Sequence, residues 1–172
     1  MIDLLRKRRS VRRFDDRGIE PEKIALLKEA VLRSPSSRNF DPWEFIFVED
    51  KQLLEALSKS KPHGATFLKG AALGIVVCAD DARSDVWVED CSIASILAQL
   101  TAQSLGLGSC WIQIRKRFYE EGTPSEAYIR TILNIPDTIR VLSIVGMGYP
   151  AEQPEPIRRE TLKDNKIHSD RW

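Results

Sequence analysis

The sequence VWVEDCSIASILAQLTAQSLGLGSCWIQ, residues 86–113, contains the clearest structural signal in the chain. Between Cys91 and Gly106 it has no charged side chain. Glu89 and Asp90 favour the start of a helix before this run, and Gly106 favours a left-handed stop after it. Apolar or small residues recur at helical spacing along two faces, at positions 91, 94, 98, 102 and 105 and at 93, 97, 100 and 104. The pattern predicts a helix about 30 Å long that is buried nearly all round.

This predicted helix does not fit a membrane span. Crossing a bilayer takes about 20 predominantly apolar residues, and the run is shorter and contains Gln99, Thr101 and Gln103. Small residues at 94, 95, 98 and 102 would let a neighbouring backbone come close. Two interpretations remain: a core helix within one domain, or a central helix that also lies at a dimer interface. We favour the second.

The length and composition indicate one domain, residues 1–172, which is long enough to bury about 70% of its unfolded surface. A net charge of +1 argues against nucleic acid or an acidic membrane as partner. The three cysteines lack metal-ligand spacing, so we expect a reducing cytoplasmic location, no disulfide framework and no metal site. Basic residues 6–9 interrupt any apolar run of the signal-peptide kind.

The remaining pattern predicts an α+β fold. Helices are expected at residues 2–7, 21–33, 51–59, 87–106 and 124–133, and strands at 44–48, 71–79, 108–114 and 140–147. These elements do not alternate as regular βα repeats, so we expect a sheet with helices on both faces. The tail is polar and extended from 154 to 159, a short helix follows it, and the terminal Trp172 needs a surface to lie on, such as a second subunit.

Two polar stretches have the composition of binding sites. Residues 8–14, RRSVRRF, would be a solvated surface patch on the simplest interpretation. Arginines around a serine hydroxyl also suit a phosphate or a flat anionic ring, because guanidinium offers forked donors at constant charge. Residues 34–43, SPSSRNFDPW, form a turn-rich loop whose hydrogen-bonding side chains gather beside an aromatic residue. The loop at 61–64 is expected to lie over the site, without a catalytic role for His63.

Five motifs, in chain order, resemble those of the FMN-dependent nitroreductase family. RRSVRRF at 8–14 resembles its R-R-S-x-R-x-F signature, and SPSSRNFDPW at 34–43 its S-P-S-S-x-N-x-Q-P-W loop. GLGSCWI at 106–112 resembles its G-L-G-S-x-W strand, GMGYP at 146–150 its G-x-G-Y-P turn, and Arg158-Arg159 its basic pair before the tail. The five motifs cover nearly the whole chain, which makes the resemblance specific.

The resemblance implies a nitroreductase-like α+β sandwich with a mixed, mainly antiparallel sheet and an intertwined homodimer. FMN would bind at the subunit interface, and residues 151–172 would form an arm that packs on the partner subunit. Arg8 and Ser10 would hold the phosphate and ribityl chain, with Arg9 beside them and Arg158 or Arg159 adding charge.

The ring contacts follow from the same resemblance. Arg12 would meet the pyrimidine edge, where a fixed positive charge stabilises the reduced, anionic flavin. A backbone N–H near Gln113 would point at N5, so Arg12 and Gln113 are the expected catalytic residues. Trp111 and Ile112 would pack on one flavin face. The ring would also be lined, from the other subunit, by Pro35, Ser36, Ser37 and Asn39.

Three features depart from the family pattern. Asp41 stands where glutamine is usual, and Gln113 replaces an acidic residue that some members have. The chain is shorter than the long bacterial enzymes, which implies a more open active site. Cys110 lies beside Trp111, where a small buried thiol is a better interpretation than a redox centre.

The function implied is that of an FMN-dependent oxidoreductase. It would take hydride from NADH or NADPH and pass it to a nitroaromatic, a quinone or a similar small electrophile by a ping-pong mechanism. Reductive dehalogenation and flavin breakdown are chemistries that the same fold allows. A flavin-binding protein with little turnover is the alternative of a different class. A nucleic-acid module built on residues 6–13 fits the near-zero net charge poorly.

Overall fold

A computed structural model describes residues 1–172 and contains one central four-stranded sheet. Its strands are β1 (Trp43–Val48), β2 (Leu73–Asp80), β6 (Ile139–Gly148) and β3 (Gly108–Gln113), in that spatial order. All neighbours are antiparallel, and the one parallel contact is an isolated bridge between Ser10 and Ser109. The two central strands are buried on both faces, which explains their continuous apolar sequence.

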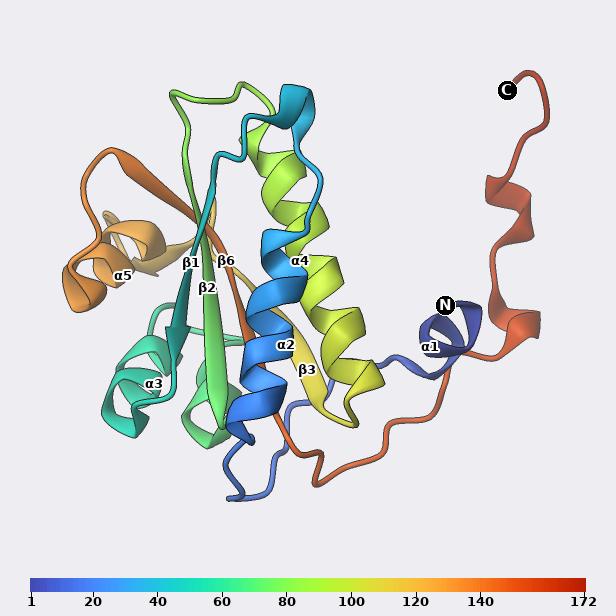
Figure 1. The fold of residues 1–172 in the computed structure, drawn as a ribbon, viewed down its shortest axis with the longest axis horizontal. Coiled ribbons are helices and arrows are strands. Elements are labelled where there is room, and N and C mark those ends of the chain that lie inside the picture. Colours follow the sequence, from blue (N-terminus) through green and yellow to red (C-terminus); the bar gives the residue numbers. More distant parts are fainter.

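Helices cover both faces of this sheet (Figure 1). On one face lie α2 (Pro21–Leu32) and α4 (Trp87–Ser104), packed on a core that includes Leu27 and Ala98. On the other lie α3 (Lys51–Ser58), α5 (Ser125–Leu133) and the 3-10 turn η2 (Thr66–Gly70), around a core that includes Leu54. The expected α+β sandwich is confirmed.

Smaller elements complete the chain. A short hairpin of β4 (Phe118–Glu120) and β5 (Thr123–Pro124) precedes α5 and was not expected from the sequence. The N-terminal helix is α1 (Ile2–Lys7), and the loop after α2 contains the 3-10 turn η1 (Ser37–Asn39). The short helix expected in the tail is instead two 3-10 turns, η3 (Arg159–Thr161) and η4 (Asp164–Lys166).

Helix α4 ends as its sequence predicts, but it is not buried all round. Gly106 adopts φ +77°, and the N–H of Leu107 returns to the carbonyl of Ala102 at 2.8 Å, as in a Schellman cap. Its first predicted face is buried from Cys91 to Ala102 and partly buried at Leu105, whereas Ile93 and Ile96 on the other side are 40% and 37% exposed. Periodicity shows that a helix face is apolar and does not show what covers it. None of the helices, α4 included, combines the length and the apolarity that crossing a bilayer requires.

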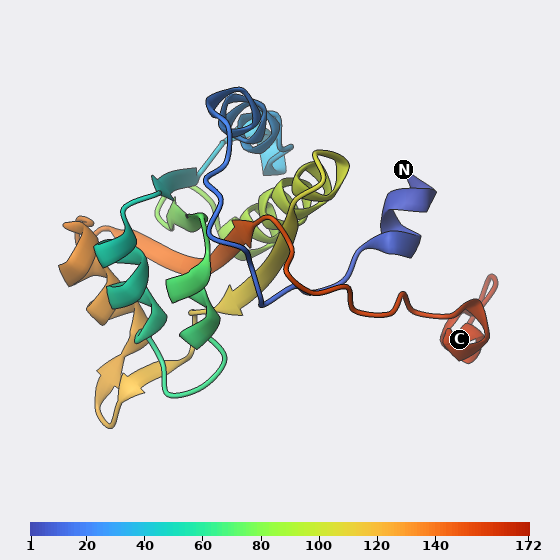
Figure 2. The same cartoon turned by 90° about the horizontal axis from the view of Figure 1, so that it is seen from below.

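The two ends of the chain run side by side and leave the domain on the same side (Figure 2). The backbone N–H of Val11 donates to the carbonyl of Ser109 at 3.0 Å, and the N–H of Ala151 donates to the carbonyl of Arg13 at 2.9 Å. Gly108 leaves room for this packing, because a Cβ there would lie 2.8 Å from the side chain of Val11. The motif glycine therefore lets the basic run lie directly against the start of β3.

A polar cluster joins the start of α2 to the end of β6. Tyr149 donates its hydroxyl hydrogen to Glu20 and accepts from the ammonium of Lys23 at 2.6 Å. The guanidinium of Arg17 lies over the tyrosine ring, 3.3 Å from its centroid. The pKa of Glu20 is lowered from 4.5 to about 2. The main cause is the hydrogen bond from the Tyr149 hydroxyl, and the second is a backbone hydrogen bond of Glu20 itself.

This cluster makes part of the stability depend on acid pH. A carboxyl with a depressed folded-state pKa stabilises the fold fully above its unfolded value of 4.5 and loses that contribution as pH falls towards 2. Urea unfolding of the wild type should therefore show a steeper loss of stability between pH 5 and pH 2.5 than unfolding of Tyr149→Phe. Equal slopes in that window would show that the tyrosine does not shift Glu20.

Candidate functional site

The basic run touches the outer edge of β3 at Ser10, which bridges Ser109, and then passes the end of β6, where Phe14 bridges Pro150. Arg8, Ser10 and Arg12 each act against the burial that raises the pKa of the Cys110 thiol, so all three lie near this thiol. Val11 packs on Gly108, and the guanidinium of Arg9 donates to the carbonyl of Glu155 in the arm. The structure therefore groups three of the predicted site residues and turns Arg9 away from them.

Cys110 is a buried thiol, 2% exposed, and forms no disulfide. Burial raises its pKa, with smaller opposing effects from Arg12, Ser10 and Arg8. A thiol with a raised pKa carries little thiolate at neutral pH, so it is a poor nucleophile and a poor redox group. These properties support the structural interpretation of Cys110.

The register of β3 sets the direction of its backbone groups. Cys110 faces Gly146 and Ile112 faces Ile144, and the N–H of Ile114 donates to Leu142 at 3.1 Å. Even-numbered residues therefore bond to β6, and in an antiparallel pair the residues between them point their N–H and C=O groups away. Trp111 and Gln113 consequently present their backbone to the outer edge.

The side chains of this strand divide between its two faces. Trp111 donates its indole N–H to the amide oxygen of Gln113 at 3.1 Å, and the Gln113 amide donates to the carbonyl of Arg115 at 3.0 Å. Both side chains are thus tied to each other on one face. Ile112 points to the opposite face and is 0% exposed in the core. Because consecutive strand residues alternate, the side chains of Trp111 and Ile112 point to opposite faces of β3, and their packing on a flavin face stays a prediction.

The loop between α2 and β1 is locally strained. Arg38, Asn39 and Asp41 have φ values of 53°, 57° and 46°, in the left-handed region that non-glycine residues avoid. Ser36 donates its hydroxyl hydrogen to the Asp41 carboxylate at 2.6 Å, and the Asp41 N–H donates back to Ser36 Oγ at 2.9 Å. Asp41, in the position where the family has glutamine, therefore engages one of the predicted ring-lining residues. Strain of this kind concentrates at binding sites.

A buried carboxylate that sequence reasoning treated only as a helix-start signal holds this loop. Asp90, in the first turn of α4, is 3% exposed. It accepts the backbone N–H of Ser37 at 2.9 Å and the hydroxyl of Ser84 at 3.2 Å. The remaining predicted loop residues, Pro35 and Asn39, are exposed. An acid at the head of an apolar helix was the available signal for this role.

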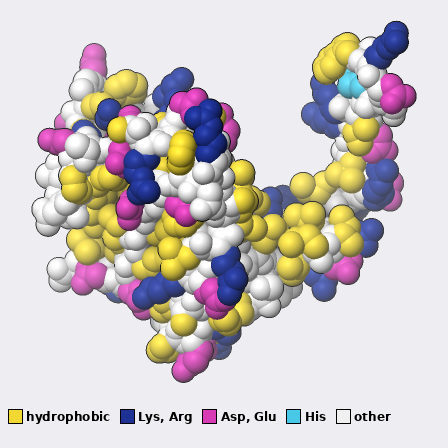
Figure 3. Space-filling model, turned by 45° about the horizontal axis from the view of Figure 1, so that its top comes forward, with side chains coloured by type: hydrophobic (Ala, Val, Ile, Leu, Met, Phe, Trp, Pro, Cys, Tyr) yellow, Lys and Arg dark blue, Asp and Glu magenta, His cyan; other side chains and the backbone are white.

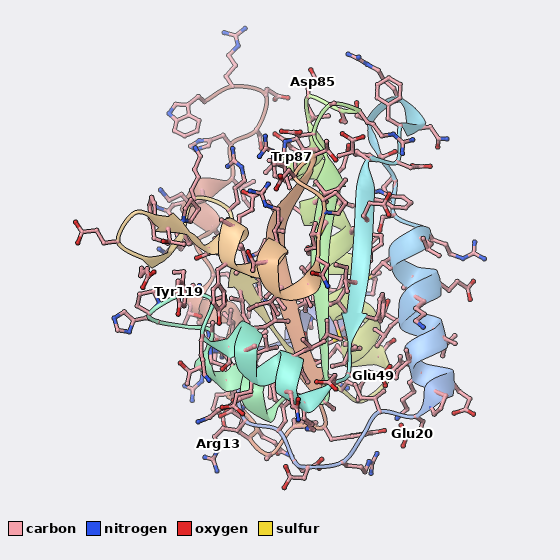
Figure 4. All side chains as sticks on the ribbon, turned by 90° about the vertical axis from the view of Figure 1, so that its left-hand side faces the viewer. Arg13, Glu20, Glu49, Asp85, Trp87 and Tyr119 are labelled. Carbon is pink, nitrogen blue, oxygen red and sulfur yellow. The ribbon has the colours of Figure 1, made fainter.

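Within one chain, the basic run and this loop lie at opposite ends of α4. The loop is bonded to the first turn of the helix, at the end that Asp85 and Trp87 mark in Figure 4, whereas Arg13 lies at the other end of the molecule. Eighteen helical residues separate these ends by about 27 Å. Arg158 and Arg159 are exposed on the arm, where Arg159 pairs with Asp164 at 3.0 Å.

The main cavities of the single chain do not gather the predicted residues. One, of ≈ 410 Å³, lies between α2 and β1 and meets the candidate loop at Asp41 and Trp43. The groove beside the basic run measures ≈ 180 Å³ and is lined by Arg9, Val11 and Gly108 among others. The candidate site is therefore an open surface along the edge of β3.

Comparison with known proteins gives a consistent result. The family model described as the nitroreductase family matches residues 5–149. A solved structure of an FMN-dependent nitroreductase from Clostridium difficile R20291 is 42% identical, covers all of both chains and superposes with a TM-score of 0.98.

Two further relatives carry related names. A protein of Archaeoglobus fulgidus named for NADH dehydrogenase or NAD(P)H nitroreductase activity is 35% identical, over 99% of this chain and 98% of its own length. An FMN reductase [NAD(P)H] of Bacillus subtilis is 27% identical, over 89% of this chain and 67% of its own. With a family model that matches most of its length, the chain belongs to the nitroreductase family.

Proposed function

We propose that the protein is an FMN-dependent oxidoreductase that takes hydride from NADH or NADPH and passes it to a small electrophile such as a nitroaromatic or a quinone. The observation that carries this proposal is that Arg8, Ser10 and Arg12 gather near Cys110, where Ser10 bridges the outer edge of β3 and the strand has outward-facing backbone groups. The names of the relatives support the cofactor and the donor.

The residues at this edge suit FMN in their chemistry. Arg8 supplies a permanent positive charge for the phosphate, and Ser10 supplies a hydroxyl for the ribityl chain. Arg12 supplies a fixed positive charge for the pyrimidine edge, and Gln113 supplies a backbone N–H. FMN itself supplies the two-electron chemistry, so no side chain has to act as nucleophile.

We propose ping-pong kinetics because the expected arrangement leaves one open side. Trp111, fixed by its bond to Gln113, would cover one face of the ring. Donor and acceptor would then use the other face in turn. Free cysteines at 78, 91 and 110 suit a reducing compartment, and we place the activity in the cytoplasm.

We propose that the working molecule is a homodimer whose partner completes each site. The strained loop lies at the far end of α4 from the basic run, so a second copy is the simplest source of Pro35, Ser36, Ser37 and Asn39. The arm, residues 151–172, stands away from the body of its own domain with hydrophobic side chains along it (Figure 3). Trp172 is fully exposed and Ile167 is 76% exposed, which suits packing on a partner subunit.

Arg12→Ala should lower the two-electron midpoint potential of bound FMN and slow hydride uptake, while much of the FMN affinity remains. Loss of one charged hydrogen bond, about 1.5 to 3 kcal/mol, corresponds to about 30 to 60 mV. The potential is measured by equilibration with a reference dye. Arg13→Ala is the matched control, because it removes the same charge from the adjacent exposed position of the run. An unchanged potential in Arg12→Ala would show that Arg12 does not meet the ring.

A further inference from the structure

Lys61 lies at the outer edge of β3, where sequence reasoning expected only a covering loop. It follows α3 in the chain, and its ammonium donates to the carbonyl of Gln113 at 3.2 Å. The contact spans 52 residues of sequence. Lys61 forms no ion pair, whereas its neighbour Lys59 pairs with Glu55 at 3.5 Å on the surface. The Lys61 charge is therefore held at the strand edge by a single neutral acceptor.

The side chain of Lys61 is partly buried from solvent, and positively charged groups lie around it. Burial is the main cause that lowers the pKa of Lys61, and the positive charge of Arg117 is the second. Lys61 also acts on the Cys110 thiol in the same sense as Arg12 and Arg8, so the three cations share one neighbourhood. Gathering positive charges without an acidic partner is unfavourable unless an anion or an electron-rich ligand offsets it.

The position of Lys61 relative to Gln113 gives it a specific function. In a strand, the N–H and the C=O of one residue point to the same edge, so a group bonded to the Gln113 carbonyl lies next to the Gln113 N–H. An ammonium has three donors, and the chain engages one of them. Two donors and the charge are left for a ligand at this edge.

We propose that Lys61 is a positioning residue that fixes the Gln113 peptide and places a positive charge beside its N–H, and so favours a ligand that carries more negative charge. This inference rests on the proposed function, in which that ligand is FMN. The positive charge of Lys61 would add to that of Arg12, and Lys61 comes from a loop that lies outside the five family motifs.

The test compares four variants of the full-length protein loaded with FMN. Lys61→Met removes the charge and keeps the stem, Lys61→Gln keeps one donor for the Gln113 carbonyl without the charge, and Lys61→Arg keeps the charge. Lys59→Met is the matched control. The readouts are the FMN dissociation constant, from quenching of flavin fluorescence, and the midpoint potential, from dye equilibration.

Lys61→Met and Lys61→Gln should each weaken binding of reduced FMN relative to oxidised FMN by about tenfold, which lowers the potential by about 30 mV. Lys61→Arg should keep the midpoint potential of the wild type, and Lys59→Met should also leave it unchanged. A wild-type potential in both neutral variants would overturn the inference while leaving the proposed function intact. A wild-type protein that binds no FMN would overturn both.

Discussion

A chain that ends at Gln153 should be monomeric and should fail to retain FMN. The truncation removes the apolar side chains of the arm, of which Ile157 and Leu162 are 58% and 49% exposed in the single chain. It also removes both candidate phosphate ligands of the arm, Arg158 and Arg159. Light scattering after size exclusion measures the mass, which should fall from twice that of the chain to once. Absorbance at flavin wavelengths measures the retained cofactor.

The cut at Gln153 removes the bond from Arg9 to Glu155 and preserves the contacts of Glu152 with the basic run. Glu152 accepts the backbone N–H groups of Arg12 and Arg13 at 2.6 and 3.2 Å, and it remains in the shortened chain. Circular dichroism should therefore show that the shortened chain keeps its secondary structure. Leu162→Asp is a point version of the same test, and Lys163→Asp, at the next exposed position, is its control. A truncated chain that stays dimeric and yellow would exclude the arm from the interface.

Arg8→Ala should weaken FMN binding by about 10- to 100-fold, which corresponds to the loss of a charged hydrogen bond of about 1.5 to 3 kcal/mol. Arg8 lies near the Cys110 thiol of β3, with Ser10 and Arg12. Binding is measured by titration of the apoprotein with FMN at fixed ionic strength, because phosphate contacts weaken with salt.

Arg9→Ala is a closely matched control for this effect. It removes the same charge from the adjacent position, but Arg9 faces the arm and donates to Glu155. We expect Arg9→Ala to change FMN affinity by much less than Arg8→Ala. Equal losses in the two variants would mean that FMN responds to the total charge of the run and that Arg8 has no specific contact with it.

The fold could be predicted largely from local patterns. Long apolar runs such as those of β2 and β6, and helices with clear stops such as Gly106, determine element positions to within about two residues. The β4–β5 hairpin was missed because its strands have three and two residues, too few to show a period. The exposure of Ile93 and Ile96 could not be predicted, because an apolar helix face has the same sequence whether a core or a partner covers it.

The candidate site divides in the same way between local and distant information. Motif resemblance located the residues, and the register of β3 was needed to separate Trp111 from Ile112. Asp90 and Lys61 were missed because each acts on a residue more than fifty positions away in the sequence, Ser37 and Gln113 respectively. Contacts over such separations depend on the packing of several elements and leave no periodic signal.

The central proposal is that this chain binds FMN and that the bound FMN accepts hydride from NADH or NADPH and passes it on. It is tested most directly by the absorbance spectrum of the purified protein, recorded without oxygen before and after addition of NADH and then NADPH. We expect flavin bands that bleach with at least one donor and return when a quinone or a nitroaromatic is added. Flavin bands that neither donor bleaches would indicate a binding protein with little turnover. A colourless protein that also fails to bind added FMN would contradict the cofactor assignment and, with it, the proposed function.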